Sequence, residues 1–354
     1  MQSWRQTAMP IRSTFCRGSL RVGGAKSRLE MRTLHWRLAH RLRPARRILL
    51  RHLYRDNNRQ LADSILVAGT ARSGTTWLGD LLAGAEGRVL FEPFHAGKIA
   101  ALQGLSYFPY LRPDEENPQL TAYCRQVFTG VIRHPWVDRE IANLRPRFRV
   151  IKEIRANLFL KWLHNQFPQV PQLLIVRHPC AVVLSRLQLR WATGSDLASF
   201  LDQPPLIEDH LAPYLDIFHQ THTDVEKHAM IWCISHLVPF RQFRPGELNI
   251  VFYENLCLQP HPELAQIEQV VKRRFPPGAF TSLSKPSATT TASSAILTGD
   301  NQVARWRNSL SASEIRQILD IVAAFGLDHL YGDGLLPKGA STVEPTGHAQ
   351  VERA

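Results

Sequence analysis

The stretch 64-SILVAGTARSGTTW-77 joins a short apolar run to a loop with two glycines and then to the start of a predicted helix. The run Ser64–Ala68 is typical of a buried strand, and the helix is expected from Thr75 to about Ala83. In the first turn of a helix the backbone N–H groups have no partners within the helix, and the helix dipole is positive. The sequence therefore predicts an anion-binding loop between a strand and a helix.

Short apolar strands and helices alternate along the rest of the chain. Further strands are expected at 88-RVLFE-92, 148-FRVIKE-153, 172-QLLIV-176 and 248-LNIVFY-253. Helices are expected near residues 157–165, 179–191, 224–240, 262–273 and 311–325. Residues 96–145 and 194–220 are interpreted as cap segments on the substrate side. This order predicts an α/β fold with a mostly parallel sheet flanked by helices.

The predicted loop differs from that of nucleoside triphosphatases. Gly69, Gly74 and Thr76 match the pattern GxxxxGK[ST], but Thr75 occupies the position of the lysine. The nearest cation is Arg72, three positions upstream. Because a kinase without that lysine lacks its usual contact with the β- and γ-phosphates, the pattern argues against a triphosphate ligand.

A second cation follows a later strand. Triphosphatases end a neighbouring strand in an aspartate that helps to hold Mg²⁺. Here the strand 172-QLLIV-176 is followed by Arg177, and Ser185 lies one to two turns into the next predicted helix. Arg177 and Ser185 are expected to contact one phosphate. Two separated anion sites without the triphosphate lysine predict a nucleotide with a 5′-phosphosulfate and a separate ribose phosphate, which is 3′-phosphoadenosine 5′-phosphosulfate (PAPS).

These two motifs resemble those of the PAPS-dependent sulfotransferase family. The segment 71-ARSGTTW-77 resembles the family's 5′-phosphosulfate loop, which reads close to PKSGTTW, and 177-RHPCAVVLS-185 resembles its 3′-phosphate motif, RxPxxxxxS. The weaker matches 252-FYENL-256 and 306-WRNSLS-311 extend the resemblance over about residues 64–330. The resemblance implies a P-loop-like sulfotransferase fold without a metal.

The resemblance also implies which side chains bind PAPS. These are Arg72, Ser73, Gly74, Thr75, Thr76, Trp77, Arg177 and Ser185. Arg72 replaces the lysine of the family's loop, which keeps the charge but changes its geometry. Trp77 falls where many members stack an aromatic ring on the adenine.

The acceptor branch is indicated by two other segments. The phrase 91-FEPFH-95 resembles the carbohydrate sulfotransferases, which read near FEPL there. The phenol and steroid branch has a catalytic histidine after its K-T-H strand, and the aligned strand 151-IKEIR-155 has Ile154 at that position. The resemblance therefore implies transfer of a sulfuryl group to a hydroxyl of a carbohydrate or glycolipid.

Sulfuryl transfer should resemble phosphoryl transfer, in which positioning and charge stabilisation dominate. Arg72 and Lys152 are expected to stabilise charge on the bridging oxygen. Glu92 is the first candidate for the base that removes the acceptor proton, His95 is the second and Glu153 the third. A structural cap or ion pair is the competing interpretation of Glu92, and a packing role is the competing interpretation of His95.

The net charge of +13 is concentrated in the first 60 residues, which carry 15 Lys or Arg and two acidic residues. Residues 1–60 are therefore interpreted as a basic arm, partly helical or disordered, before a sulfotransferase domain at 61–337 and a disordered tail at 338–354. Within the arm, residues 31–55 alternate Leu, Trp and Ile with Arg, as in basic helices that contact anionic membranes. A solvated tail and an organelle transit peptide are alternative interpretations. No nucleic-acid-binding signature accompanies the charge.

The compartment is predicted from cysteine usage and hydropathy. The five cysteines are odd in number and form no CxxC pair, which indicates a reduced compartment. No run of about 18 apolar residues is present. A cytoplasmic enzyme, peripheral at a membrane, is expected. The alternatives to a sulfotransferase are a P-loop kinase of a small metabolite and a non-catalytic nucleotide-binding protein.

Overall fold

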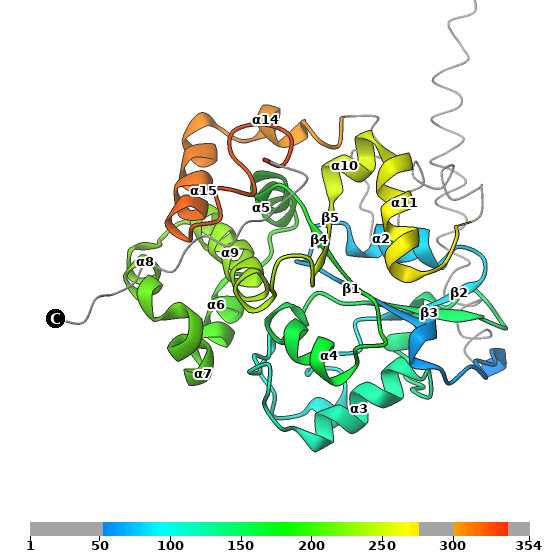
Figure 1. Ribbon diagram of the computed structural model, residues 1–354. Helices are drawn as coiled ribbons and strands as arrows, with labels where there is room; N and C mark the ends of the chain where they lie inside the picture. Colours follow the sequence, from blue (N-terminus) through cyan, green and yellow to red (C-terminus); the bar gives the residue numbers. More distant parts are fainter. Residues whose placement is uncertain (1–51, 276–300, 339–354) are drawn as a thin grey trace, which may run out of the picture. The chain divides into compact units, whose positions relative to one another are not determined.

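A computed structural model describes residues 52–275 and 301–338, which belong to one compact unit, Arg46–Ala354 (Figure 1). Most of the predicted basic arm, including residues 31–51, lies outside the described residues, as does the predicted tail after Lys338. The predictions for these segments remain predictions.

Five parallel strands form the sheet, in the order β2-β3-β1-β4-β5. They are β1 (Ser64–Ala68), β2 (Gly87–Phe91), β3 (Phe148–Lys152), β4 (Gln172–Val176) and β5 (Asn249–Phe252). In the register of the sheet, Val67 of β1 lies opposite Lys152 of β3 and opposite Leu173 of β4. The predicted α/β fold with a mostly parallel sheet is confirmed.

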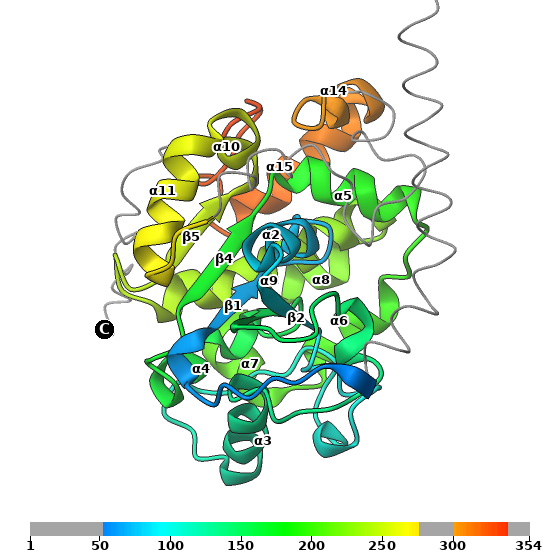
Figure 2. The same cartoon turned by 90° about the vertical axis from the view of Figure 1, so that its right-hand side faces the viewer.

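The strands are apolar because helices cover both faces of the sheet. Alternate residues of β1 point to opposite sides: Ile65 and Val67 belong to one core, and Leu66 and Ala68 belong to the other. Figure 1 shows α2, α10 and α11 on one side of the strands and α3 and α4 on the other. Figure 2 shows α11 beside β5 on the first side. Burial on both sides explains the continuous apolar runs of β1 and β4, whereas β2 and β3 also carry buried cationic residues.

The helices largely follow the predicted ranges. They are α2 (Thr75–Ala83), α3 (Pro118–Phe128), α4 (Leu160–Gln166), α5 (Pro179–Gln188), α6 (Gly194–Leu201), α7 (Pro204–Leu206), α8 (Leu215–Gln220), α9 (Asp224–Gln242), α10 (Tyr253–Leu258), α11 (Pro260–Val271), α14 (Arg305–Ser309) and α15 (Ala312–Ala324). Short helical turns occur at η1 (Leu61–Asp63), η2 (Ala100–Leu102), η3 (Val137–Glu140), η4 (Asn157–Phe159), η5 (Ile207–Leu211) and η6 (Ala212–Tyr214).

Local sequence fixes several helix starts. Pro179 occupies the first position of α5, where its missing N–H is not needed, and the side chain of His178 accepts a bond from the Cys180 N–H. Thr223 with Glu226 begins α9 with reciprocal side-chain and backbone bonds, which satisfy N–H groups that the helix leaves open. These contacts stabilise the first turns of α5 and α9, two helices that contribute residues to the cavity described in the next subsection.

Residues just before the predicted domain start contact its interior. Asp56 is 1% exposed and makes ion pairs of 2.9 Å with Arg88 and 3.0 Å with Arg149, two arginines that are fully buried. Asp138 makes a further pair of 2.7 Å with Arg88. Asp56 therefore supplies negative charge to buried arginines of β2 and β3, although it precedes the predicted boundary at residue 61.

Candidate functional site

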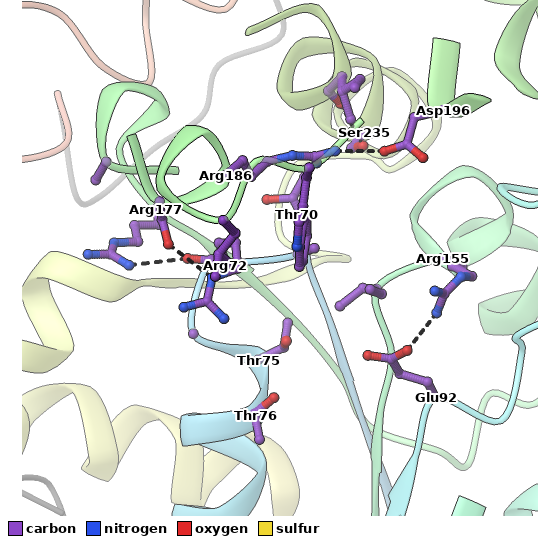
Figure 3. Close-up of a pocket in the computed structure, with 18 of the residues that line it drawn as sticks. Thr70, Arg72, Thr75, Thr76, Glu92, Arg155, Arg177, Arg186, Asp196 and Ser235 are labelled. Carbon is purple, nitrogen blue, oxygen red and sulfur yellow. Dashed lines mark hydrogen bonds and ion pairs between the residues drawn. The ribbon is translucent and has the colours of Figure 1, made fainter. Parts of the chain in front are cut away.

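A cavity of about 780 Å³ opens at the carboxyl ends of the five strands (Figure 3). Each strand contributes a residue at or just after its end: Thr70 after β1, Glu92 after β2, Lys152 on β3, Arg177 after β4 and Tyr253 after β5. Ligands of open α/β sheets bind at this edge. The topology therefore brings together groups that are far apart in the sequence.

The predicted anion-binding loop connects β1 to α2. Gly74 has a φ of 100°, a backbone conformation that other residues rarely adopt. A Cβ at this position would also clash with the Tyr253 ring, 2.8 Å from Cδ2, so both the backbone and the space require glycine. Ser73 is fully buried, and its hydroxyl donates to the Thr70 carbonyl at 2.6 Å. Ser73 thus shapes the loop from inside, whereas Gly74, Thr75, Thr76 and Trp77 line the cavity.

Arg72 connects the two predicted phosphate motifs. Its Nε donates to the Ser185 hydroxyl at 2.9 Å, and its carbonyl accepts a bond of 3.1 Å from Nη1 of Arg177. Its φ of 78° lies in the left-handed region, which for a residue other than glycine costs about 1–3 kcal/mol and persists only where the surroundings enforce it. Arg72, Arg177 and Ser185 therefore lie together at one end of the cavity.

The two arginines at this end have no carboxylate partner in the part of the chain that the structure describes. Among residues 52–275 and 301–338, no carboxylate lies within ion-pair distance of Arg72 or Arg177. Burial lowers the pKa of Arg72, and the positive charge of Arg177 lowers it further. Since like charges this close are unfavourable, the arrangement fits an anionic ligand between or beside them.

Aromatic residues form the adjoining wall. Arg177 lies over the ring of Tyr253 at 4.2 Å, and the Tyr253 hydroxyl donates to the Gln302 side chain at 2.7 Å. The ring of Trp77 packs against Tyr253 with centroids 5.4 Å apart. Trp306 also lines the cavity. Trp77 therefore offers a flat apolar surface near the anion-binding loop, which is where the resemblance places an adenine.

At the other end of the cavity, Glu92 interacts with two cations. Figure 3 shows this end, with Thr75 and Thr76 between Arg72 and the pair formed by Glu92 and Arg155. Nζ of Lys152 donates to Oε1 of Glu92, and Nη1 of Arg155 donates to Oε2 at 2.7 Å. Burial alone would raise the pKa of Glu92, but the two cations outweigh burial and lower it.

Glu92 follows β2 directly, with a φ of 45°. Its backbone N–H donates to the Lys152 carbonyl at 2.8 Å, and its carbonyl accepts a bond of 3.1 Å from the Trp136 indole. These bonds hold a backbone conformation that a glutamate rarely adopts. In this conformation the Glu92 side chain lines the cavity.

Glu153, the third candidate base, faces away from the cavity. Its Oε2 accepts from the Phe94 N–H at 2.8 Å, and its Oε1 accepts from the N–H groups of Ile154 and Arg155 at 2.8 and 3.0 Å. It is fully buried and does not line the cavity. These contacts indicate that Glu153 holds the chain after β3 in place.

His95, the second candidate base, lines the cavity beside Glu92. Its ring packs edge-on against Tyr107 and Trp136, with centroids 5.3 and 5.2 Å away. Burial, with the positive charge of Arg155, lowers the pKa of His95 to about 4. His95 is therefore neutral near pH 7, and its buried Nδ1 has no partner among the described residues.

The sequence interpretation missed three charged residues of the cavity, Arg155, Arg186 and Asp196. Arg155 bonds both Glu92 and the Tyr107 hydroxyl, and Arg186 of α5 pairs with Asp196 of α6 at 2.6 Å. The third charged residue in 151-IKEIR-155 was a signal for Arg155, since it lies three positions after Lys152, the last residue of β3. Of the aromatic residues in the 96–145 segment, Tyr107, Phe108 and Trp136 line the cavity.

Several buried polar atoms of the cavity lining have no hydrogen-bond partner among the described residues. Within the described part of the chain these atoms are Thr70 Oγ1, His95 Nδ1, Trp306 Nε1 and the Nε atoms of Arg155, Arg177 and Arg186. Because buried polar groups are nearly always hydrogen-bonded in folded proteins, such a set fits a polar ligand.

Across residues 52–275 and 301–338, no three His, Cys, Asp or Glu side chains gather in a way that could hold a metal ion. No helix in these ranges is long and apolar enough to cross a membrane.

Comparison with known proteins identifies the family to which this chain is similar. A family model described as a sulfotransferase domain matches residues 62–318. No curated protein matches the chain. Among solved structures, the chain is similar to a sulfotransferase domain from the curacin biosynthetic pathway, with 16% identity, a TM-score of 0.41 and coverage of 74% of this chain and 96% of that one.

Two further solved structures are similar. The sulfotransferase domain of the Synechococcus PCC 7002 olefin synthase has 17% identity and a TM-score of 0.37, and the match covers 77% of this chain and 96% of that one. Mouse sulfotransferase SULT7A1, complexed with PAP, has 13% identity and a TM-score of 0.39, with coverage of 76% and 86%.

Proposed function

The chain belongs to the sulfotransferase domain family, and we propose that it transfers the sulfuryl group of PAPS to a hydroxyl of a carbohydrate or glycolipid. The observation that carries the proposal is the meeting of Arg72, Arg177 and Ser185 at one end of a cavity whose other end contains Glu92 and Lys152. One end suits an anionic nucleotide, and the other suits removal of a proton.

The residues present fit PAPS. Arg72 and Arg177 offer two guanidinium groups without a carboxylate partner among the described residues, and the start of α2 offers backbone N–H groups. We assign Arg177 and Ser185 to the 3′-phosphate, and we assign Arg72 with Gly74, Thr75 and Thr76 to the 5′-phosphosulfate. Trp77 would pack on the adenine. The cavity of about 780 Å³ lies in the usual range for sites of small organic ligands.

PAPS supplies a sulfuryl group on a good leaving phosphate. As the acceptor oxygen bonds to sulfur, the bond between sulfur and the phosphate oxygen breaks, and its electron pair remains on the phosphate. The chain's own residues orient the two substrates in line and stabilise charge. Lys152 is buried, packs beside Gly79 of α2 and lines the cavity, and in this proposal its ammonium group stabilises charge on the bridging oxygen.

Glu92 is the base in this proposal, and its Oε1 takes the proton of the acceptor hydroxyl. Its carboxylate is ionised because Lys152 and Arg155 lower its pKa, so it is ready to accept a proton at neutral pH. A low pKa makes Glu92 a weak base, so its contribution depends on being held within hydrogen-bond reach of the acceptor hydroxyl. His95 is the alternative base, since it is neutral and lines the same end of the cavity.

The proposed acceptor class rests on two features. The phrase 91-FEPFH-95 resembles the carbohydrate branch, and Ile154 stands where the phenol branch has its histidine. In the structure Ile154 lines the cavity near Arg155, and the exposed ring of Tyr107 lies at the same end. A flat ring beside charged and polar side chains suits the apolar face and hydroxyls of a sugar.

An acceptor panel tests this proposal. The protein would be incubated with PAPS and, separately, with glucose, N-acetylglucosamine, octyl β-glucoside and p-nitrophenol, and sulfated products would be measured by mass spectrometry. We expect product with at least one of the three sugars and little with the phenol. Sulfation of the phenol alone would contradict the carbohydrate assignment while leaving the sulfotransferase assignment intact.

Membrane contact through residues 31–55 remains a separate proposal. It rests on the Arg-rich, Leu-containing sequence of that segment. Binding to vesicles with and without anionic lipid, compared between the full chain and a chain lacking residues 1–51, tests it. Equal binding by both chains would contradict it. A cytoplasmic location likewise remains a prediction from the cysteines.

A further inference from the structure

The two carboxylate oxygens of Glu92 have different cationic partners. Lys152 donates to Oε1, and Arg155 donates to Oε2 at 2.7 Å. Glu92 is 6% exposed, Lys152 and Arg155 are each 3% exposed, and all three line the cavity. Both contacts are buried, charge-assisted hydrogen bonds, and such bonds are strong. The two cations differ, however, in their other neighbours: Lys152 packs beside α2, and Arg155 contacts Tyr107.

In the proposed reaction, the bound donor competes with Glu92 for the ammonium group of Lys152. It ends β3 beside β1, whose Val67 lies opposite it, and β1 leads directly into the anion-binding loop. A Cβ built on Gly79 of α2 would lie 3.5 Å from Cβ of Lys152, so the lysine stem packs along the helix that follows the loop. A sulfuryl group held at the start of α2 would therefore attract the Lys152 ammonium away from Oε1.

Arg155 is anchored differently. Its Nη1 bonds Glu92, its Nη2 donates to the Tyr107 hydroxyl, and its guanidinium lies over the Tyr107 ring at 4.4 Å. Its backbone N–H donates to the buried Glu153 carboxylate at 3.0 Å. In Figure 3 Arg155 lies beyond Glu92 as seen from Thr75 and Thr76. Contacts on both sides of the guanidinium keep it at Glu92 rather than at the donor.

We propose that Arg155 is a positioning residue that holds the Glu92 carboxylate in place while Lys152 turns from Oε1 of Glu92 to the bridging oxygen of the donor. This inference rests on the proposed function. Oε1 then becomes available to the acceptor hydroxyl, and Oε2 stays fixed by Arg155. The Tyr107 hydroxyl, through its bond to Nη2, sets the direction of the guanidinium.

The first test removes the guanidinium and then restores it. Arg155→Met keeps the length of the stem but cannot hold Glu92, so kcat with PAPS and the fastest sugar of the panel should fall about 10²-fold. The KM for PAPS and the affinity for adenosine 3′,5′-bisphosphate should change less than about threefold, since Arg155 does not contact the proposed donor site. Millimolar guanidinium chloride should restore part of kcat, and an equal concentration of NaCl should not.

Two further variants separate positioning from folding. Arg155→Lys keeps the charge but cannot bond Glu92 and Tyr107 with a planar fork, so kcat should fall about tenfold. Tyr107→Phe keeps the ring and removes the acceptor of the Arg155 bond, and a smaller loss of kcat is expected. Arg273→Met is the control, because it breaks a half-buried ion pair of 2.8 Å with Asp63 outside the cavity. Its kcat should match the wild type.

The outcomes distinguish this inference from the proposed function. A wild type that sulfates none of the panel with PAPS would overturn both. A wild type that sulfates a sugar, with Arg155→Met within about twofold of its kcat, would overturn the positioning role alone. Loss of kcat in Arg155→Met without rescue by guanidinium, with weaker nucleotide binding, would show a structural role instead. If Arg155→Met does not fold, wild-type kcat in Arg155→Lys would overturn the inference.

Discussion

The side-chain Nε of Arg72 donates a hydrogen bond of 2.9 Å to the hydroxyl of Ser185, a residue 113 positions later in the chain. Arg72 lies in the loop after β1, and Ser185 lies on α5, after β4. Because β1 and β4 are neighbours in the sheet, their following segments meet at one edge. Two short motifs therefore form one anion-binding end of the cavity, on which the assignment of the donor depends.

The 3′-phosphate assignment predicts a ligand-dependent effect at Arg177. Arg177→Ala should weaken binding of adenosine 3′,5′-bisphosphate by about 1.5–3 kcal/mol, the range for hydrogen bonds to charged groups. The loss should largely vanish with adenosine 5′-phosphate, which lacks the 3′-phosphate. Titration calorimetry with both nucleotides measures the difference.

Ser185→Ala is the matched variant for this experiment. It should show the same dependence on the 3′-phosphate, with a smaller loss of about 0.5–1.5 kcal/mol for a single hydroxyl. If either variant weakens both nucleotides equally, the residue holds the protein fold and not the 3′-phosphate.

The assignment of the base predicts separate effects at Glu92 and His95. Glu92→Gln keeps the shape of the side chain but cannot accept a proton, so turnover should fall by about two orders of magnitude or more. Affinity for adenosine 3′,5′-bisphosphate should be nearly unchanged. Steady-state rates and calorimetry on Glu92→Gln and His95→Ala give the comparison. Near wild-type turnover in Glu92→Gln together with a large loss in His95→Ala would move the assignment to His95.

The pKa shifts predict a flat pH profile on the acidic side. Lys152 and Arg155 outweigh burial and lower the pKa of Glu92, and the pKa of His95 is about 4. A base loses activity as the pH falls through its pKa, so neither group should cause loss between about pH 8 and pH 5.5. Initial rates at saturating PAPS across this range measure the profile. An acidic limb with an apparent pKa near that of an ordinary histidine would contradict the prediction.

The contacts of Asp56 predict where the chain can be shortened. Removing residues 1–51 should leave turnover intact, whereas removing residues 1–60 deletes the carboxylate that pairs with buried Arg88 and Arg149. Asp56→Asn should reduce the free energy of unfolding by about 3–5 kcal/mol, as for other buried ion pairs that lose one partner. Urea denaturation measures the change.

Asp63→Asn provides the control, because it breaks a half-buried ion pair with Arg273. Pairs this close to the surface contribute about 0–1 kcal/mol, so this variant should unfold near the wild-type urea concentration. Equal stability of Asp56→Asn and Asp63→Asn would show that Asp56 is dispensable.

Local patterns predicted the sheet and the anion-binding loop. Residues 65–68 and 173–176 are apolar throughout. Gly69 follows the first run and Pro179 lies shortly after the second, so both strands could be located from composition. The Gly74 position follows from turn chemistry, because the chain needs a positive φ there. Their spacing after a strand also predicted that Arg177 and Ser185 contact one phosphate, and this remains a prediction.

The pairings between distant charged residues were not predictable in the same way. Arg155 meets Glu92 across 63 positions, and only the parallel pairing of β2 with β3 brings them together. Arg88 and Arg149 lie within strands, where sequence gives no sign that Asp56 neutralises them. Ser73 is the opposite case: the motif predicted a ligand-binding residue, but its side chain is buried and bonds the Thr70 carbonyl.

The central claim is that this chain moves a sulfuryl group from PAPS to a sugar hydroxyl, and a direct measurement is transfer of label from sulfur-labelled PAPS in the presence of EDTA. The account predicts that label appears in a sugar of the panel, that one adenosine 3′,5′-bisphosphate forms for each sulfated product, and that Arg177→Ala needs more PAPS to reach the same rate. No labelled product with any acceptor, together with phosphorylation of the same sugars from Mg-ATP, would contradict it.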